Sequence, residues 1–360
     1  MRPWTKACLL AGTLMLALTP LGAAEAHSDA GIENETYADG VELMAKQDWK
    51  GAAKKFEKAT QQKMDYAEAY DQWGLCQNNL GDFLGAVTAF KHATFTNPRL
   101  TIAWYHLGCG FENISKDAKA QDSYERALGV QPMADLKTVT LTHFRLGLLL
   151  KRLAIKKDGP KADLGPAISH LEAAVRMDGD FAEAHNELGR CYYLIGRYPE
   201  AIDQYTLAIK NYEDYAAAWS NRGVAHWADG NWDLALQDCL KAVDIDSEFA
   251  GGHYNLAEIL YSHAQKLQSQ DKAFVYHDEA QKAIDEYRQA AGLDPKSVDF
   301  ALGLGKACRG YHDYPDAIAA YKAALKLDKK NAEAKTALLE MKKEQASFID
   351  HLPKPTPKAE

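Results

Sequence analysis

A period of 34 residues runs through the chain from residue 33 onward and constrains the fold more than any other feature. Small residues return at three registers of this period. At the first register the alanines are Ala52, Ala86, Ala120, Ala167, Ala201, Ala235, Ala283 and Ala317. Each is followed seven residues later by another alanine, and six of them are preceded by a glycine twelve residues earlier. A fixed period of this length predicts an array of stacked structural repeats.

Each repeat contains two stretches with apolar residues at i, i+3, i+4 and i+7, which predicts a pair of amphipathic helices. The small residues let neighbouring helices approach at the close end of the usual range of roughly 8–10 Å. Aromatic residues of the second stretch fill the remaining volume: Phe56, Phe90, Tyr124, Tyr205, Tyr287 and Tyr321. The pattern therefore predicts an all-α chain of stacked helix pairs.

One repeat matches a known pattern of small and bulky residues nearly throughout. It contains, in order, Trp104, Leu107, Gly108, Phe111, Ala120, Tyr124, Ala127 and Pro132. These residues resemble the tetratricopeptide repeat (TPR) family, whose pattern is W-x2-L-G-x2-Y followed by alanine, an aromatic residue, alanine and proline. The resemblance implies a TPR α-solenoid, a right-handed superhelix of about eight helix pairs that ends in a C-terminal capping helix.

The repeats and their flanks divide the chain into segments. TPR units 1–3 are predicted at 33–134 and units 4–8 at 140–331, with insertions at 151–163 and within 262–280. Residues 332–348 are predicted to form the capping helix that an open array needs, and 349–360 a disordered Pro- and Lys-rich tail. We expect the first insertion, with the five extra residues before unit 4, to loosen the stacking of units 3 and 4. The second should lengthen both helices of unit 7 into a protruding hairpin.

Residues 1–26 are typical of a secretory signal peptide. Arg2 and Lys6 precede an apolar run, and Ala24-Glu25-Ala26 offers a small-residue cleavage site. The run is shorter than the roughly 20 residues needed to span a bilayer, although a retained membrane anchor stays an alternative. The chain is therefore predicted to be exported, to a periplasm or as a secreted protein, without a membrane span.

Composition argues against nucleic-acid binding, and it does not decide whether the cysteines are paired. A net charge of −8 and a pI of 5.9 argue against nucleic-acid binding, which needs a clustered basic surface. Five cysteines follow residue 26, with no CxxC pair. We predict packed free thiols, with a Cys76–Cys109 bridge as the alternative.

No catalytic or metal-ligand arrangement is evident in the sequence. No nucleophile and base stand at a recognisable spacing, and no His, Cys, Asp and Glu set has ligand spacing. His143, His185, His226 and His253 occupy bulky positions of predicted helices, which favours packed rings over metal ligands. The protein is predicted not to be an enzyme and to need no cofactor or metal.

The TPR resemblance implies where a partner would bind. In that family the first helix of each unit lines a concave groove, with its second, fifth, ninth, twelfth and thirteenth positions pointing inward. The twelfth position is aromatic in three consecutive units, at Tyr193, Trp227 and Tyr261. With their polar neighbours, the predicted groove site is Arg190, Tyr193, Asn221, Trp227, Tyr254, Asn255, Tyr261 and Arg309. The alternative is that the aromatic rings only complete the packing between helices.

The resemblance to the carboxylate clamp of chaperone-binding TPR proteins is incomplete. Ser220, Tyr254 and Leu302 stand where lysines would be needed, so a different ligand is implied. The leading hypothesis is an exported, non-catalytic adaptor that binds a peptide or partner protein during envelope assembly or secretion. One alternative is a homo-oligomeric scaffold. Another is a soluble receptor whose aromatic ladder binds a small ligand such as a saccharide.

Overall fold

The computed structural model describes residues 32–130, 135–159, 162–269 and 273–350, and over these residues it contains seventeen helices and no strand. The predicted all-α fold is confirmed for this part of the chain. The predicted signal peptide and the tail beyond residue 350 lie outside the described residues. The described chain divides between Ile195 and Gly196 into two compact units, the N-terminal unit and the C-terminal unit, and each is described by itself.

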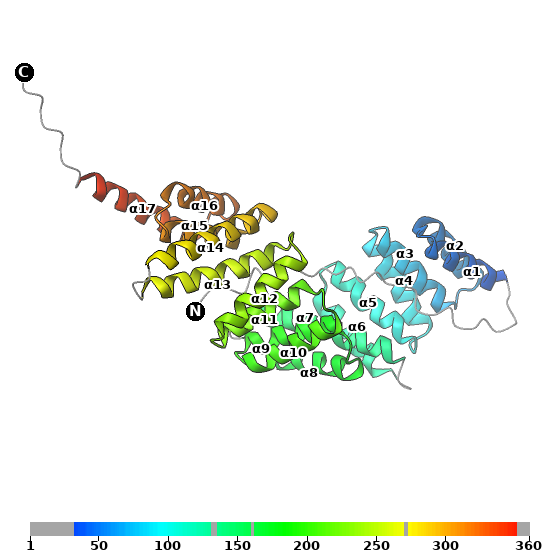
Figure 1. Cartoon of the computed structure of the whole chain (residues 1–360). Coiled ribbons are helices and arrows are strands. Elements are labelled where there is room, and N and C mark those ends of the chain that lie inside the picture. The colour runs from blue at the N-terminus through cyan, green and yellow to red at the C-terminus, as the bar shows by residue number, and fades with distance from the viewer. Residues whose placement is uncertain (1–31, 131–134, 160–161, 270–272, 351–360) are drawn as a thin grey trace, which may run out of the picture. The chain divides into compact units, whose positions relative to one another are not determined.

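The N-terminal unit consists of helix pairs in chain order (Figure 1). Within it α1 packs on α2, α3 on α4, α5 on α6 and α7 on α8, and α9 packs on α8. The bounds are α1 (Ile32–Ala45), α2 (Trp49–Gln62), α3 (Ala67–Asn79), α4 (Phe83–Thr96), α5 (Thr101–Asn113), α6 (Asp117–Gly129), α7 (Leu136–Asp158), α8 (Gly165–Met177) and α9 (Ala182–Leu194).

The C-terminal unit continues the same arrangement. The bounds are α10 (Tyr198–Asn211), α11 (Ala216–Ala228), α12 (Trp232–Ile245), α13 (Ala250–Gln268), α14 (Ala273–Leu293), α15 (Val298–Gly310), α16 (Tyr314–Leu327) and α17 (Ala332–Asp350). The insertion of unit 7 lies in α13 and α14, which have 19 and 21 residues and lie side by side in Figure 1. The capping helix α17 extends two residues beyond its predicted end.

Close approach of the paired helices explains the repeated glycines. A Cβ atom on Gly108 would lie 2.4 Å from the ring of Tyr124, and one on Gly74 would lie 2.5 Å from the ring of Phe90. Real Cβ atoms do not approach other atoms so closely, so these two positions require glycine. The rings that fill the space are almost fully buried, at 0% exposure for Tyr124 and 1% for Phe90. This packing is the one predicted from the sequence.

The extra residues around unit 4 belong largely to its first helix. Helix α7 is continuous over 23 residues, so the extra residues lengthen it at both ends instead of interrupting it. Leu146 and Leu149 of α7 belong to the same buried cluster as Tyr105, Phe111 and Tyr124 of the preceding pair. The inserted residues thus continue the helix and leave a packed face in place, and the expected loosening stays a prediction.

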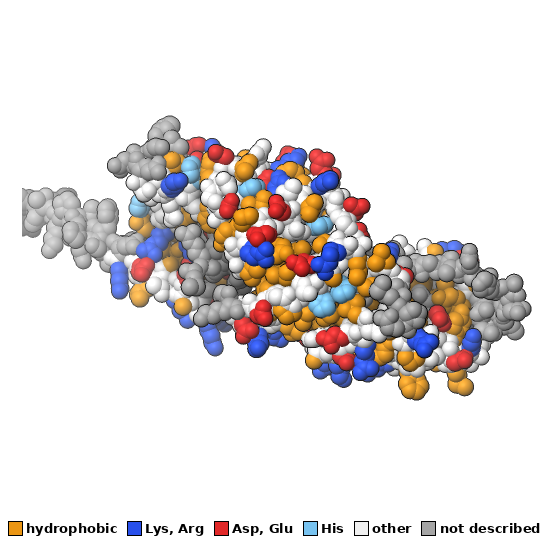
Figure 2. Space-filling model, turned by 90° about the horizontal axis from the view of Figure 1, so that it is seen from below, with side chains coloured by type: hydrophobic (Ala, Val, Ile, Leu, Met, Phe, Trp, Pro, Cys, Tyr) orange, Lys and Arg blue, Asp and Glu red, His pale blue; other side chains and the backbone are white. Residues whose placement is uncertain are grey.

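The surface and the cysteines bear on three further predictions. None of the described helices is both long and apolar enough to cross a bilayer. On the face seen in Figure 2, acidic and basic side chains are interspersed. The cysteines of the described residues are all free, which confirms the prediction of packed thiols: Cys76, Cys109, Cys191, Cys239 and Cys308.

Ala201→Leu should destabilise the protein by about 1–3 kcal/mol, the usual cost of overpacking a core. Ala201 is completely buried on α10, where a larger side chain has no space. Since each helix pair contacts only its neighbours, hydrogen exchange should accelerate around α10–α12 and not in α1–α4. The matched control is Ala319→Leu at an exposed alanine of α16, which should change little. A uniform rise in exchange along the chain would contradict this localisation.

Candidate functional site

The first helices of successive pairs lie next to one another and form one face of each unit, which we call the first-helix face. In the N-terminal unit α3, α5, α7 and α9 are in contact in that order, and in the C-terminal unit α11, α13 and α15 are. Residues at equivalent positions of neighbouring repeats are thereby brought together across helices. Arg190 and Tyr193 belong to the first-helix face of the N-terminal unit, and the other six predicted site residues belong to that of the C-terminal unit.

One predicted site residue, Asn255, forms a polar contact between adjacent first helices. Asn255 is 4% exposed, and its side-chain amide donates a hydrogen bond of 2.9 Å to Ser220 Oγ on the preceding first helix. His106 and Asp71 make an equivalent buried pair in the N-terminal unit, at 2.9 Å. Both pairs join residues 35 positions apart, one more than the repeat period. Asn255 therefore holds neighbouring repeats in register. The spacing of 35 residues between two polar side chains could have indicated this contact from the sequence.

Two predicted aromatic anchors share an apolar base. Trp227 on α11 and Tyr261 on α13 are both half-buried, and both pack against one buried cluster. That cluster consists of Ala235, Cys239, Leu256, Ile259, Leu260 and Ala283. The hydroxyl of Tyr261 also donates to the backbone carbonyl of Lys306 on α15, at 3.2 Å. The two rings are thus fixed by packing while part of each remains accessible.

Tyr254 and Asn221 lie on the same two first helices. Tyr254 is half-buried on α13, where its ring stacks on Phe300 with centroids 4.9 Å apart and meets the edge of Tyr287 at 5.7 Å. Asn221 is half-buried on α11. Tyr254 therefore contributes more to packing between α13, α14 and α15 than the sequence indicated.

Acidic residues of the capping helix meet the cations at the end of the C-terminal unit. Arg309 donates to Glu340 at 2.9 Å, and the ammonium of Lys306 lies 2.6 Å from Glu333. Both glutamates belong to α17, which was predicted only to cap the array. The sequence could have indicated these pairs, because Glu333 and Glu340 occupy the second and ninth positions of a further first helix, which are groove-facing positions in the TPR resemblance.

A buried ion pair organises the predicted residues of the N-terminal unit. Glu187 on α9 accepts hydrogen bonds from Lys151 of α7 and, at 2.7 Å, from Arg190. Lys151 is only 5% exposed. Burial alone would raise the pKa of Glu187, but the two neighbouring cations overcome it and lower the pKa to about 2. Arg190 is thereby held in place beside Tyr193, which is half-buried on the same helix.

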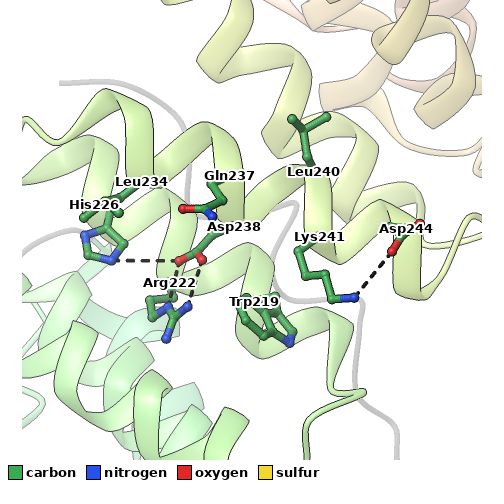
Figure 3. Close-up of a pocket in the computed structure, with 9 residues that line it drawn as sticks. All are labelled: Trp219, Arg222, His226, Leu234, Gln237, Asp238, Leu240, Lys241 and Asp244. Atoms are coloured by element: carbon green, nitrogen blue, oxygen red, sulfur yellow. Dashed lines mark hydrogen bonds and ion pairs between the residues drawn. The ribbon is translucent and has the colours of Figure 1, made fainter.

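A hollow of about 540 Å³, which was not predicted from the sequence, lies between α11 and α12 (Figure 3). Its lining residues are Trp219, Arg222, His226, Leu234, Gln237, Asp238, Leu240, Lys241 and Asp244. Arg222 forms two hydrogen bonds with Asp238, at 2.7 and 2.8 Å, and its guanidinium lies 4.7 Å from the centroid of the Trp219 ring. The signal was Arg222 itself, which stands where the pattern W-x2-L has leucine.

The fold defines a class of protein: an α-solenoid built of helix pairs that pack only on their neighbours. Residues 163–215, 205–248 and 272–332 match the family model of the tetratricopeptide repeat. Over these residues the chain is therefore similar to tetratricopeptide repeats. A solved tetratricopeptide repeat protein from Parabacteroides merdae superposes with a TM-score of 0.52 over 76% of this chain and 98% of that chain. At 13% identity, this likeness shows the fold alone.

Two plant proteins are similar over part of this chain. Hsp70-Hsp90 organizing protein 3 of Arabidopsis thaliana is 27% identical over 147 residues, which is 39% of this chain and 24% of that protein. Hsp70-Hsp90 organizing protein 1 of Glycine max is 27% identical over 204 residues, 55% of this chain and 31% of that protein. The similarity thus spans about a quarter to a third of the relatives' length.

Proposed function

We propose that this protein is an exported, non-catalytic adaptor that binds a peptide or a partner protein on its first-helix face. The observation that carries the proposal is the pair of half-buried rings, Trp227 and Tyr261, on adjacent first helices above one apolar cluster. Rigid aromatic side chains give a large contact area at low entropic cost, and they are enriched among binding hot spots. Repeat proteins of this architecture use extended faces of this kind for binding. The related plant proteins are named as organizers of two other proteins, which supports a binding role.

Ligand screening tests the class of partner. Peptide and saccharide libraries are titrated against the wild type and Trp227→Phe, and the difference in tryptophan fluorescence reports on residue 227 alone. We expect peptides to change this difference signal and saccharides to leave it unchanged. A response to saccharides only would favour the small-ligand receptor and reject the adaptor.

Export rests on residues 1–26 and has its own experiment. Expression of the full chain in a Gram-negative host, followed by fractionation and intact-mass measurement, should give a periplasmic protein cleaved after Ala26. A full-length protein in the membrane fraction would instead show that the segment is retained as an anchor.

One observation favours the homo-oligomeric scaffold as a second candidate function. Leu84 and Phe95 of α4 are 69% and 86% exposed, and at eleven residues apart they lie on the same side of the helix. Light scattering coupled to size-exclusion chromatography decides this point. A monomer at every concentration would reject the scaffold, and a dimer that Phe95→Ser dissociates would support it.

A further inference from the structure

Two histidines of unit 4 face each other within the helix pair of α7 and α8. The Nδ1 atom of His143 lies 2.9 Å from the Nδ1 atom of His170, and the ring centroids are 5.1 Å apart with 38° between the ring planes. Both imidazoles are half-buried. Two ring nitrogens at this distance need a positive centre between them, either one shared proton or a cation, because two lone pairs repel each other.

We propose that His143 and His170 bind one divalent transition-metal cation through their two Nδ1 atoms, with Cu²⁺ bound most tightly. Imidazole nitrogen is a preferred ligand of Cu²⁺, Ni²⁺ and Zn²⁺. With metal–nitrogen bonds of about 2.0–2.1 Å, the separation of the two nitrogens corresponds to an angle of about 90° at the metal. A right angle suits neighbouring ligands of the tetragonal geometry of Cu²⁺ and Ni²⁺ better than a tetrahedral Zn²⁺ site.

The backbone holds the two rings in fixed positions. Gly147, one turn after His143, packs so closely on Leu171 that a Cβ atom there would lie 2.8 Å from Leu171 Cγ. Leu171 follows His170 directly and is fully buried. Sites on packed helices keep their geometry better than sites on loops, so the two ligands are held close together before a cation arrives.

The charges around the pair permit cation binding. Burial lowers the pKa of both imidazoles, and His170 and Arg176 lower that of His143 further. Glu125 of α6 acts on His170 in the opposite direction. Neutral imidazoles have the lone pairs that a metal needs, and a nearby carboxylate favours a cation. Arg176 opposes binding, although Glu172 lies 3.9 Å from it.

Binding needs a change of tautomer and a tilt of both rings, because the nitrogen and centroid distances place the two Nδ1 lone pairs nearly along one line. Without a cation, one Nδ1–H donates to the other Nδ1. When the metal bonds to both Nδ1 atoms, that proton moves to Nε2 of the same ring, and each imidazole remains neutral. Protons and metal compete for the same nitrogens, so affinity should fall as the pH drops into the range where the imidazoles protonate.

Calorimetric titration of the full chain with Cu²⁺, Ni²⁺, Zn²⁺ and Mg²⁺ tests the site. Loss of an outer-shell partner alone typically costs about 10–100-fold in metal affinity, so His143→Gln and His170→Gln should each weaken Cu²⁺ binding by at least that factor. The matched control is His92→Gln at an exposed histidine of α4, which should bind Cu²⁺ as the wild type does. Circular dichroism of each variant checks that it is folded.

Electron paramagnetic resonance of the Cu²⁺ complex provides a second readout. The wild type should show coupling to two equivalent imidazole nitrogens, and His143→Gln and His170→Gln should each lose one of them. Absence of Cu²⁺ binding by the wild type, or equal binding by all folded variants, would overturn the proposal. A preference for Mg²⁺ would do the same.

Discussion

Glu187→Ala should lower the free energy of unfolding of the N-terminal unit by about 3–5 kcal/mol, the usual cost of removing one partner of a buried ion pair. The large effect comes from Lys151, which is 5% exposed and would keep its charge without a counter-charge in the helix interface. Arg190 would lose its hydrogen bond to Glu187 at the same time. Because a repeat array need not unfold in one step, hydrogen exchange resolved by helix measures the loss better than one melting curve.

The matched control replaces the pair by apolar side chains of similar size. Lys151→Met combined with Glu187→Leu removes both charges, and such replacements are commonly neutral or stabilising. The double variant should therefore recover most of the stability lost in Glu187→Ala. A loss below about 1 kcal/mol in Glu187→Ala, the range of solvent-exposed pairs, would show that water reaches Lys151 in the folded protein.

The same ion pair makes stability depend on pH in the acid range. The pKa of Glu187 is about 2 in the folded protein against an ordinary value of 4.5. Between these values the unfolded chain binds more protons than the folded one, so stability should fall as the pH is lowered from 4.5 to 2. Glu187→Gln removes the titrating group and should flatten this part of the profile. An unchanged profile would assign the acid sensitivity to other carboxylates.

The fold was predictable because its determinants repeat. Gly108 and Tyr124 form one contact within one helix pair, and the same contact recurs every 34 residues at positions such as Gly74 and Phe90. A constraint of this kind can be read from a single sequence, since each repeat is an independent example of it.

The candidate site was less predictable because its residues depend on pairs of helices. Asn255 was assigned to a ligand because its position fits the groove, but its partner Ser220 lies on another helix. His143 and His170 are 27 residues apart, in a repeat whose helices are offset by an insertion, so no regular spacing indicated their contact. Arg309 pairs with Glu340 of the capping helix, whose match to the ninth position of a further first helix was overlooked because 332–348 was assigned only a capping role.

Trp227→Ala should weaken partner binding by about 2 kcal/mol or more, the usual threshold for a hot spot. The exposed part of the indole provides contact area for the partner, and the buried part rests on the cluster that includes Cys239 and Leu256. Since the ring is only half-buried, the loss of folding stability should stay well below the roughly 3–5 kcal/mol that truncation of a core tryptophan costs. Fluorescence anisotropy of a labelled peptide and thermal melting, measured on the same variant, give the two quantities.

Tyr212→Ala is the matched control, because Tyr212 is 53% exposed and lies between α10 and α11, off the first-helix face. It should leave both affinity and melting temperature nearly unchanged. In Trp227→Ala, a loss of affinity would identify Trp227 as a binding residue, whereas a loss of melting temperature would identify it as a core residue. If the variant melts at a much lower temperature and yet binds the peptide with the affinity of the wild type, the indole is part of the core. The half-buried rings of Trp227 and Tyr261 would then complete the packing of α11 on α13, and the partner would have to bind elsewhere on the array.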